Sequence, residues 1–201
     1  MKKLMMVLVL SGLIAQPLSA EELATTQTTS ASVSSLAANG SDYAATPSNE
    51  LKDQIDAYLF DAARKGDLEI LKVFADSHYD FNRQDAKGYT ALILAAYNGR
   101  QEAVTFLLAN GADPCQEDKR GNTALLGAIF KGEVRIAREL MKAECTTNHR
   151  NKAGQTPAMY AALFQRQEIM EALKENGADL TVLDNAGNSV ESLQRLNEAG
   201  R

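Results

Sequence analysis

The sequence predicts an all-α repeat protein, a solenoid of stacked helix-turn-helix units. Glycine recurs at a fixed interval of 33 residues, and each of these glycines has threonine or serine two places later. The four glycines are Gly88, Gly121, Gly154 and Gly187. A fixed period of this size is the signature of a stacked repeat. Alanine pairs and leucines fill the intervals, which favours helices that lie close together.

The residues of one unit each have a structural reason. Threonine in the first turn of the first helix can accept a backbone N–H. The pair Ala95 and Ala96 lets that helix approach its neighbour, and leucines such as Leu107 fill the space between helices. Gly111 is expected to end the second helix in the left-handed conformation. No single unit can bury its own apolar face, so the stack is the folding unit.

Two positions depart from this pattern. Glu144 stands where other units have Gly111 and Gly177. Gln165 stands where three earlier units have glycine, at Gly66, Gly99 and Gly132. A residue other than glycine at such a turn costs stability or changes the turn.

The first 20 residues read as a secretory signal peptide. Lys2 and Lys3 precede an apolar run from Leu4 to Ala15, and small residues end the segment at Ala20. The run is shorter than the roughly 20 residues that span a bilayer. We expect cleavage after Ala20 and a periplasmic protein, with secretion as the alternative. Loss of the two lysines takes the formal net charge from −5 to −7.

Residues 21–46 are rich in threonine, serine and alanine and contain few large apolar residues. Such a segment cannot bury enough surface to offset the entropy of ordering, so we interpret it as a disordered tether. Pro47 and Ser48 then supply a helix start. The folded domain is expected to cover residues 47–201.

The stretch from Gly88 to Asp113 resembles the ankyrin repeat, with GYTALILAAYNG in the first half and NGAD at its end. GNTAL and GQTPA open the next two units in the same register. The resemblance covers about three quarters of the chain and implies helix-turn-helix units joined by β-hairpin loops. The units would span about 55–87, 88–120, 121–153 and 154–186, with a C-terminal cap at 187–201.

Nothing in the sequence predicts catalysis or a metal site. The chain has two histidines, His78 and His149, and two cysteines, Cys115 and Cys145. No catalytic signature surrounds either cysteine, and the spacing of Cys115, Cys145 and His149 matches no zinc finger or ribbon. We therefore expect a protein without enzymatic activity, cofactor or metal.

Cys115 and Cys145 are candidates for a disulfide, since exported chains tend to oxidise their thiols. They fall in the closing loops of successive repeats, three places out of register. Adjacent repeats lie roughly 10 Å apart, whereas a disulfide needs Cα atoms within about 7 Å. The bridge therefore requires the two loops to lean toward each other.

The resemblance implies partner binding through the hairpin tips and the exposed side of the first helices, which together form a concave face. Seven cations and four aromatic residues share that face, and no acid is among the residues carried over. The predicted partner-binding residues are Arg64, Lys65, Lys87, Tyr89, Tyr97, Asn98, Lys119, Arg120, Asn122, Phe130, Lys131, Lys152, Gln155, Leu163 and Phe164. The alternative is that the cations only solvate the tips and some aromatic side chains belong to the core.

Exposed aromatic residues beside cations suit a protein partner with an acidic patch and apolar anchors. Export and the negative net charge argue against nucleic acid. We expect a monomer that acts as a protein-protein interaction module. The chain also resembles small periplasmic ankyrin-like proteins of Gram-negative bacteria, which implies assistance to a redox enzyme such as catalase in peroxide resistance. The alternative is an immunity or inhibitor protein that occludes a toxic enzyme.

Overall fold

The computed structural model describes residues 47–143 and 147–199. The signal peptide, the tether, Glu144 and Cys145 lie outside the described residues. The chain divides into two compact units, residues 1–55 and 56–201. The first contains, among described residues, the beginning of helix α2 (Pro47–Lys65). All other described helices belong to the second unit, which carries the repeats.

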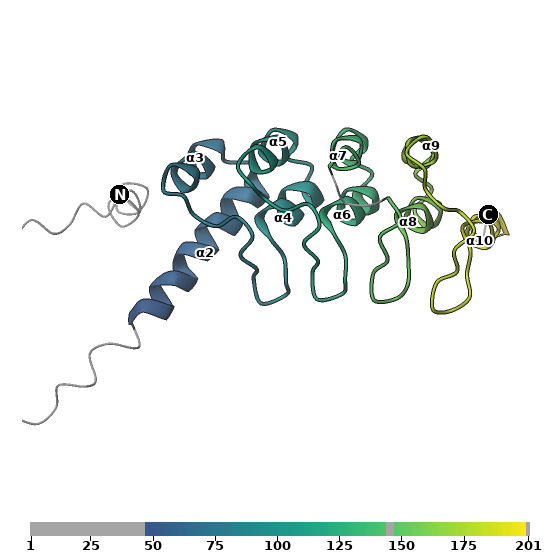
Figure 1. Cartoon of the computed structure of the whole chain (residues 1–201), viewed down its shortest axis with the longest axis horizontal. Coiled ribbons are helices and arrows are strands. Elements are labelled where there is room, and N and C mark those ends of the chain that lie inside the picture. Colours follow the sequence, from purple (N-terminus) through teal and green to yellow (C-terminus); the bar gives the residue numbers. More distant parts are fainter. Residues whose placement is uncertain (1–46, 144–146, 200–201) are drawn as a thin grey trace, which may run out of the picture. The chain divides into compact units, whose positions relative to one another are not determined.

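Two rows of helices and a row of loops make up the second unit (Figure 1). The first helices of the repeats pack side by side in one row, α4 (Ala91–Tyr97) on α6 (Ala124–Lys131), and α6 on α8 (Pro157–Leu163). The last helix, α10 (Val190–Ala199), packs on α8. The described residues contain helices and turns but no strand.

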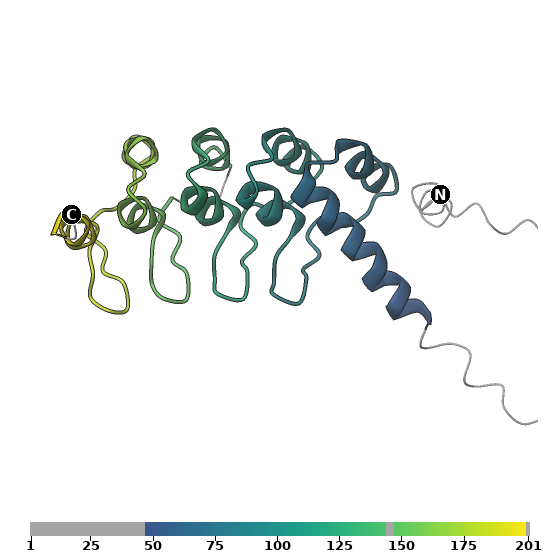
Figure 2. The ribbon, with the colours of Figure 1, turned by 180° about the vertical axis from the view of Figure 1, so that it is seen from behind.

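The second helices form the other row, and the view from behind shows the same order (Figure 2). This row is built in sequence from α3 (Leu68–Asp76), α5 (Gln101–Ala109), α7 (Val134–Leu140) and α9 (Gln167–Glu175). The loop that follows each second helix turns back in a hairpin-like bend before the next first helix (Figure 1). Among described residues, the predicted hairpin loops are present as turns without strand pairing.

The core lies between the two helix rows and is made of the predicted small and branched residues. Ala95 and Ala96 are fully buried, as is Leu107. Thr90 is the N-cap of α4, where its hydroxyl accepts the Ile93 N–H at 3.2 Å. Thr156 caps α8 in the same way. Helices α4 and α8 are therefore fixed at one end by a side-chain cap and on one face by close packing, whereas Thr123 at the start of α6 makes no such bond.

The turns between helices keep their form where glycine is absent. Gly66, Gly99 and Gly132 all have positive φ, and Gln165 adopts φ 56° at the equivalent position. The turn is therefore unchanged at Gln165, and the residue itself takes up the strained left-handed conformation. His78, one period before Gly111, is a second residue with a side chain in this conformation, with φ 53°, and it was not predicted.

Candidate concave binding face

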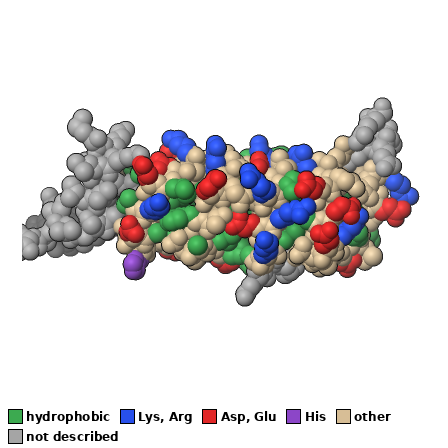
Figure 3. Space-filling view, turned by 90° about the horizontal axis from the view of Figure 1, so that it is seen from above, with side chains coloured by type: hydrophobic (Ala, Val, Ile, Leu, Met, Phe, Trp, Pro, Cys, Tyr) green, Lys and Arg blue, Asp and Glu red, His purple; other side chains and the backbone are tan. Residues whose placement is uncertain are grey.

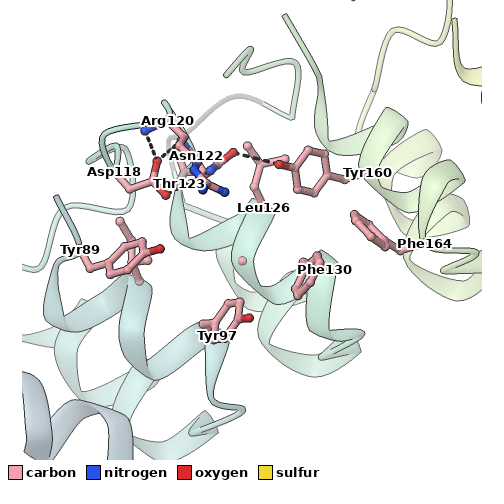
Figure 4. A pocket seen from close by; sticks show the side chains of 12 residues that line it. Tyr89, Tyr97, Asp118, Arg120, Asn122, Thr123, Leu126, Phe130, Tyr160 and Phe164 are labelled. Carbon is pink, nitrogen blue, oxygen red and sulfur yellow. Dashed lines mark hydrogen bonds between the residues drawn. The ribbon is translucent and has the colours of Figure 1, made fainter. Parts of the chain in front are cut away.

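Two adjoining grooves open on the concave face. The central groove has a volume of about 350 Å³ and lies over α4, α6 and α8 and their hairpin loops. Figure 4 shows it from close by. Its lining consists of Tyr89, Ile93, Tyr97, Asp118, Arg120, Asn122, Thr123, Leu126, Gly127, Phe130, Tyr160 and Phe164.

The neighbouring groove, of about 510 Å³, lies toward the N-terminal end of the stack. It shares Tyr89, Ile93 and Tyr97 with the central groove. Arg64 and Lys87 place two cations in its lining. We call this the N-terminal groove. Its remaining lining consists of Asp85, Ala86, Leu94 and Asn98.

A row of aromatic rings follows the central groove across three repeats (Figure 4). Tyr97 stacks on Phe130 with ring centroids 5.7 Å apart, and Phe130 meets Phe164 edge-on at 4.7 Å. Tyr160 meets Phe164 edge-on at 5.6 Å. Tyr97 keeps 40% of its surface exposed and Phe130 keeps 37%. These rings are thus packed against one another while remaining open to solvent.

Cations lie beside this aromatic row. The Lys131 ammonium stands 5.0 Å from the centre of the Tyr97 ring, within the range of a cation–π contact. Arg120 lines the central groove from the hairpin side (Figure 4). The hairpin tips are joined by single backbone bonds, from Lys119 N to Lys87 O and from Lys152 N to Arg120 O. These bonds align the basic tip residues of successive repeats.

Two acids, Asp118 and Asp85, line the grooves although neither was among the predicted partner-binding residues. Asp118 faces the central groove, where its Oδ1 accepts the backbone N–H groups of Arg120 and Asn122 at 2.7 and 2.8 Å. Asp85 does the same in the preceding hairpin and lies 3.6 Å from Arg64. Their carboxylates are therefore engaged in holding the turns, as expected for hairpin acids at repeated positions.

Several predicted binding residues already have partners within the protein. Asn122 Oδ1 accepts from Asn151 Nδ2 at 2.9 Å and from the Tyr160 hydroxyl at 3.1 Å. Burial raises the pKa of Tyr160, which keeps this hydroxyl protonated as a donor. Asn98 donates to Leu94 O. These side chains hold the shape of the face rather than standing ready for a ligand.

Every predicted partner-binding residue lies among the described residues, and the structure separates them into two groups. One group lines a groove: Arg64, Lys87, Tyr89, Tyr97, Asn98, Arg120, Asn122, Phe130 and Phe164. The other group lines neither groove: Lys65, Lys119, Lys131, Lys152, Gln155 and Leu163. Within this second group, Lys65 pairs with Asp61 at 2.7 Å.

Sequence reasoning missed Tyr160 and Gly127, which both line the central groove. They occupy the same repeat position as Leu94, one period apart. That position is buried in α4, and it was not among the positions that the family resemblance assigned to the binding face. Variation in side-chain size at this position, from leucine to glycine to tyrosine, was the signal available.

The opposite face, formed by the second helices, shows basic and acidic side chains interspersed (Figure 3). Arg138 pairs there with Glu168 at 3.2 Å, and Lys174 with Glu171 at 3.0 Å. The described part of that face lacks a continuous row of stacked rings, since the aromatic stacking within the repeats follows the first helices.

Cys115 is not among the residues that line the two grooves. Cys115 is disulfide-bonded, but its predicted partner Cys145 lies outside the described residues, so the pairing stays a prediction. His149 Nε2 lies 2.9 Å from Gly121 O and 3.5 Å from a Glu117 oxygen. Its ring therefore joins two successive loops.

A family model described as ankyrin repeats (three copies) matches residues 29–118, 59–151 and 107–184. The chain belongs to the ankyrin repeat family. The predicted fold class, an all-α ankyrin solenoid, is confirmed. Ankyrin repeats form protein-protein interaction modules, which places the function of this ankyrin repeat protein in that class.

The similar proteins are larger. Ankyrin repeat and SAM domain-containing protein 6 of Rattus norvegicus is 43% identical over 26% of this chain and 6% of its own length. Transient receptor potential cation channel subfamily V member 5 of Oryctolagus cuniculus is 30% identical over 67% of this chain and 21% of its own. A Treponema pallidum (strain Nichols) protein named for its ankyrin repeats is 30% identical over 65% of this chain and 44% of its own length. The chain thus spans less than half the length of each.

Among the helices of the described residues, none is long and apolar enough to cross a bilayer.

Proposed function

We propose that this ankyrin repeat protein is an exported, non-catalytic module that binds a partner protein on its concave face. The observation that carries the proposal is the row of half-exposed rings at Tyr97, Phe130 and Phe164 beside Arg120 and Lys131. Aromatic residues and arginine are enriched in protein interfaces, where they supply most of the binding energy.

The charge of the face selects the partner. Arg64, Lys87 and Arg120 line the grooves, and Lys131 lies over the Tyr97 ring. These four cations outnumber the two acids of the linings, Asp85 and Asp118, whose carboxylates accept hairpin N–H groups. Complementary potentials speed encounter and suppress wrong partners. The partner in this proposal carries an acidic patch around apolar anchors.

The place of action is the periplasm, on the sequence expectation of a signal peptide. A redox enzyme such as catalase is the partner that the resemblance to periplasmic ankyrin-like proteins suggests. An inhibitor of a toxic enzyme would use the same face differently, because it would bind one partner very tightly and abolish its activity. A helper would bind more weakly and raise its partner's activity or yield.

The test is affinity capture from the periplasm of the producing cell, read by mass spectrometry. The bait is compared with a triple variant, Lys119→Glu with Arg120→Glu and Lys131→Glu. The matched control is Lys72→Glu with Arg135→Glu and Lys142→Glu, which changes the net charge equally at exposed positions of the second-helix side.

We expect a protein that is captured by the unchanged chain and by the control but not by the concave-face variant. Assay of that protein's activity in the complex then separates helper from inhibitor. Equal capture by all three baits would place binding elsewhere and contradict the proposal.

A further inference from the structure

One glycine on the concave face has no local structural reason. Gly127 lies inside helix α6, at the repeat position that holds Leu94 in α4 and Tyr160 in α8. It is not among the glycines with positive φ. Glycine in the middle of a helix is less favourable than alanine, because it loses more conformational freedom on folding.

Steric crowding does not require this glycine either. A Cβ added at Gly127 would meet Tyr97 Cβ at 3.8 Å and Tyr97 Cδ2 at 3.9 Å, which are ordinary van der Waals contacts. By contrast, a Cβ at Gly88 would come within 2.7 Å of the Lys119 backbone nitrogen. Gly88 is therefore dictated by the stacking of the hairpins, whereas Gly127 is not.

The absence of a side chain at Gly127 coincides with the central groove. Gly127 is part of the lining, with the buried side chains of Ile93 and Leu126 beside it. At the equivalent position of the neighbouring unit, Leu94 is itself buried. The unit that carries Gly127 therefore has no side chain at a position where the units on either side have a large one, Leu94 and Tyr160.

We propose that the hollow at Gly127 is a specificity pocket, which receives one large apolar side chain from a partner segment that also carries a carboxylate. The inference rests on the proposed function of the concave face and names what that face recognises. Arg120 supplies the charge complement, because it lines the same groove and is exposed. Asp118 also lines this groove, but its carboxylate is buried and held by donors of its own hairpin, whereas the exposed side chain of Arg120 is open to a carboxylate of the partner.

The test uses the full chain and a phage-displayed library of random twelve-residue peptides as the probe. Selected peptides are synthesised, and their affinities are measured by fluorescence polarisation. We expect selected peptides to contain leucine, phenylalanine or tyrosine within a few residues of an aspartate or glutamate.

Two substitutions fill the hollow to different extents. Gly127→Leu restores the side chain found at Leu94, and Gly127→Ala adds one methyl group. We expect Gly127→Leu to weaken peptide binding at least tenfold, while the melting temperature stays the same or rises. Gly127→Ala should melt higher than the unchanged chain and weaken binding less. Ala109→Leu, at an exposed position of α5, is the control and should leave binding unchanged.

This pattern separates a binding role from a structural one, because a structural glycine would lower the melting temperature when replaced. Peptides without an apolar anchor, peptides that bind Gly127→Leu as well as the unchanged chain, or a library without binders would overturn the inference. If binding is lost on the Lys119, Arg120 and Lys131 triple variant but kept on Gly127→Leu, the pocket is wrong and the concave face stands. If both variants keep full binding, both proposals fail.

Discussion

Tyr97 and Phe130 stack nearly parallel, with their planes 11° apart and their ring centroids separated by 5.7 Å. They occupy the same position of successive repeats, so the stack repeats the spacing of the helices that carry it. Each ring covers part of the other, and both rings stay partly exposed in the lining of the central groove. The stack therefore fixes aromatic surface in place before any partner binds, which reduces the entropy lost on binding.

The first prediction concerns these rings. Replacing Tyr97, Phe130 and Phe164 together by alanine should abolish partner binding. The ring–ring contacts contribute about 0.5–1.5 kcal/mol for each pair beyond the area that the rings bury. Because the rings are partly exposed, the loss for each ring should be smaller than for a fully buried phenylalanine. Far-UV circular dichroism measures the helicity of the triple variant, and urea unfolding measures its stability. Phe74→Ala is the control, since Phe74 is fully buried and its loss should cost about 3–5 kcal/mol. A collapse of helicity in the triple variant would show that the rings belong to the core.

The second prediction concerns pH. Burial, together with the hydrogen bond that its hydroxyl donates to Asp56 at 2.8 Å, raises the pKa of Tyr79 to about 12. The ordinary tyrosine pKa is about 10, so the unfolded chain ionises first. The contribution of Tyr79 to stability is complete below pH 10 and is lost as the pH rises from about 10 to about 12.

Tyr79→Phe should remove this part of the pH dependence. It should also lower stability near neutral pH by about 1.5–3 kcal/mol, the value of a hydrogen bond to a charged group. Urea unfolding of both proteins at pH 9 and pH 11 checks the difference. A parallel loss of stability in the two proteins would mean that Tyr79 ionises equally easily in the folded and unfolded chains.

The third prediction concerns the two left-handed residues that are not glycine, His78 and Gln165. Residues with a Cβ pay for this conformation, so His78→Gly and Gln165→Gly should each stabilise the protein by about 0.5–1 kcal/mol. A side chain fits at the position of His78, since a Cβ at the equivalent Gly111 would meet no atom within 4 Å. Thermal unfolding measures both variants. A lower melting temperature would show that side-chain contacts outweigh the backbone strain.

The fourth prediction concerns the disulfide. Asn82 joins two repeats, because its Nδ2 donates to Gly111 O and its Oδ1 accepts from Asp113 N. Cys115 stands one period after Asn82. The partners of Asn82 lie 29 and 31 residues after it in the sequence. Positions 29 and 31 residues after Cys115 are 144 and 146, and Cys145 stands between them in the sequence.

We therefore expect a Cys115–Cys145 bridge in place of an amide clamp. Intact mass of the exported protein should increase by two hydrogens on reduction. Removal of the bridge by Cys115→Ser should lower stability by about 3.5 kcal/mol, the chain-entropy value for a loop of roughly 30 residues. An unbridged mass for protein isolated from the periplasm would reject the pairing.

The candidate site was foreseen only in part. The repeat period placed Tyr97, Phe130 and Leu163 on one face, because residues one period apart occupy the same place in successive units. Phe164 belongs to the adjoining column, one period after Lys131. The period could not show that the hydroxyl of Tyr160, in the next unit, donates a hydrogen bond to Asn122. Such a bond depends on the distance between the units. The period also gave no reason to single out Gly127, because a period compares residue types and does not show where space remains between side chains.

The sequence by itself determined the unit, its register and the order of the helices, because glycine turns, threonine caps and apolar spacing act within about 33 residues of chain. The tertiary structure decided which side chains pair, which acids turn toward the grooves and where a hollow remains. Those outcomes depend on how closely one unit stacks on the next, and that distance is set jointly by side chains from both units.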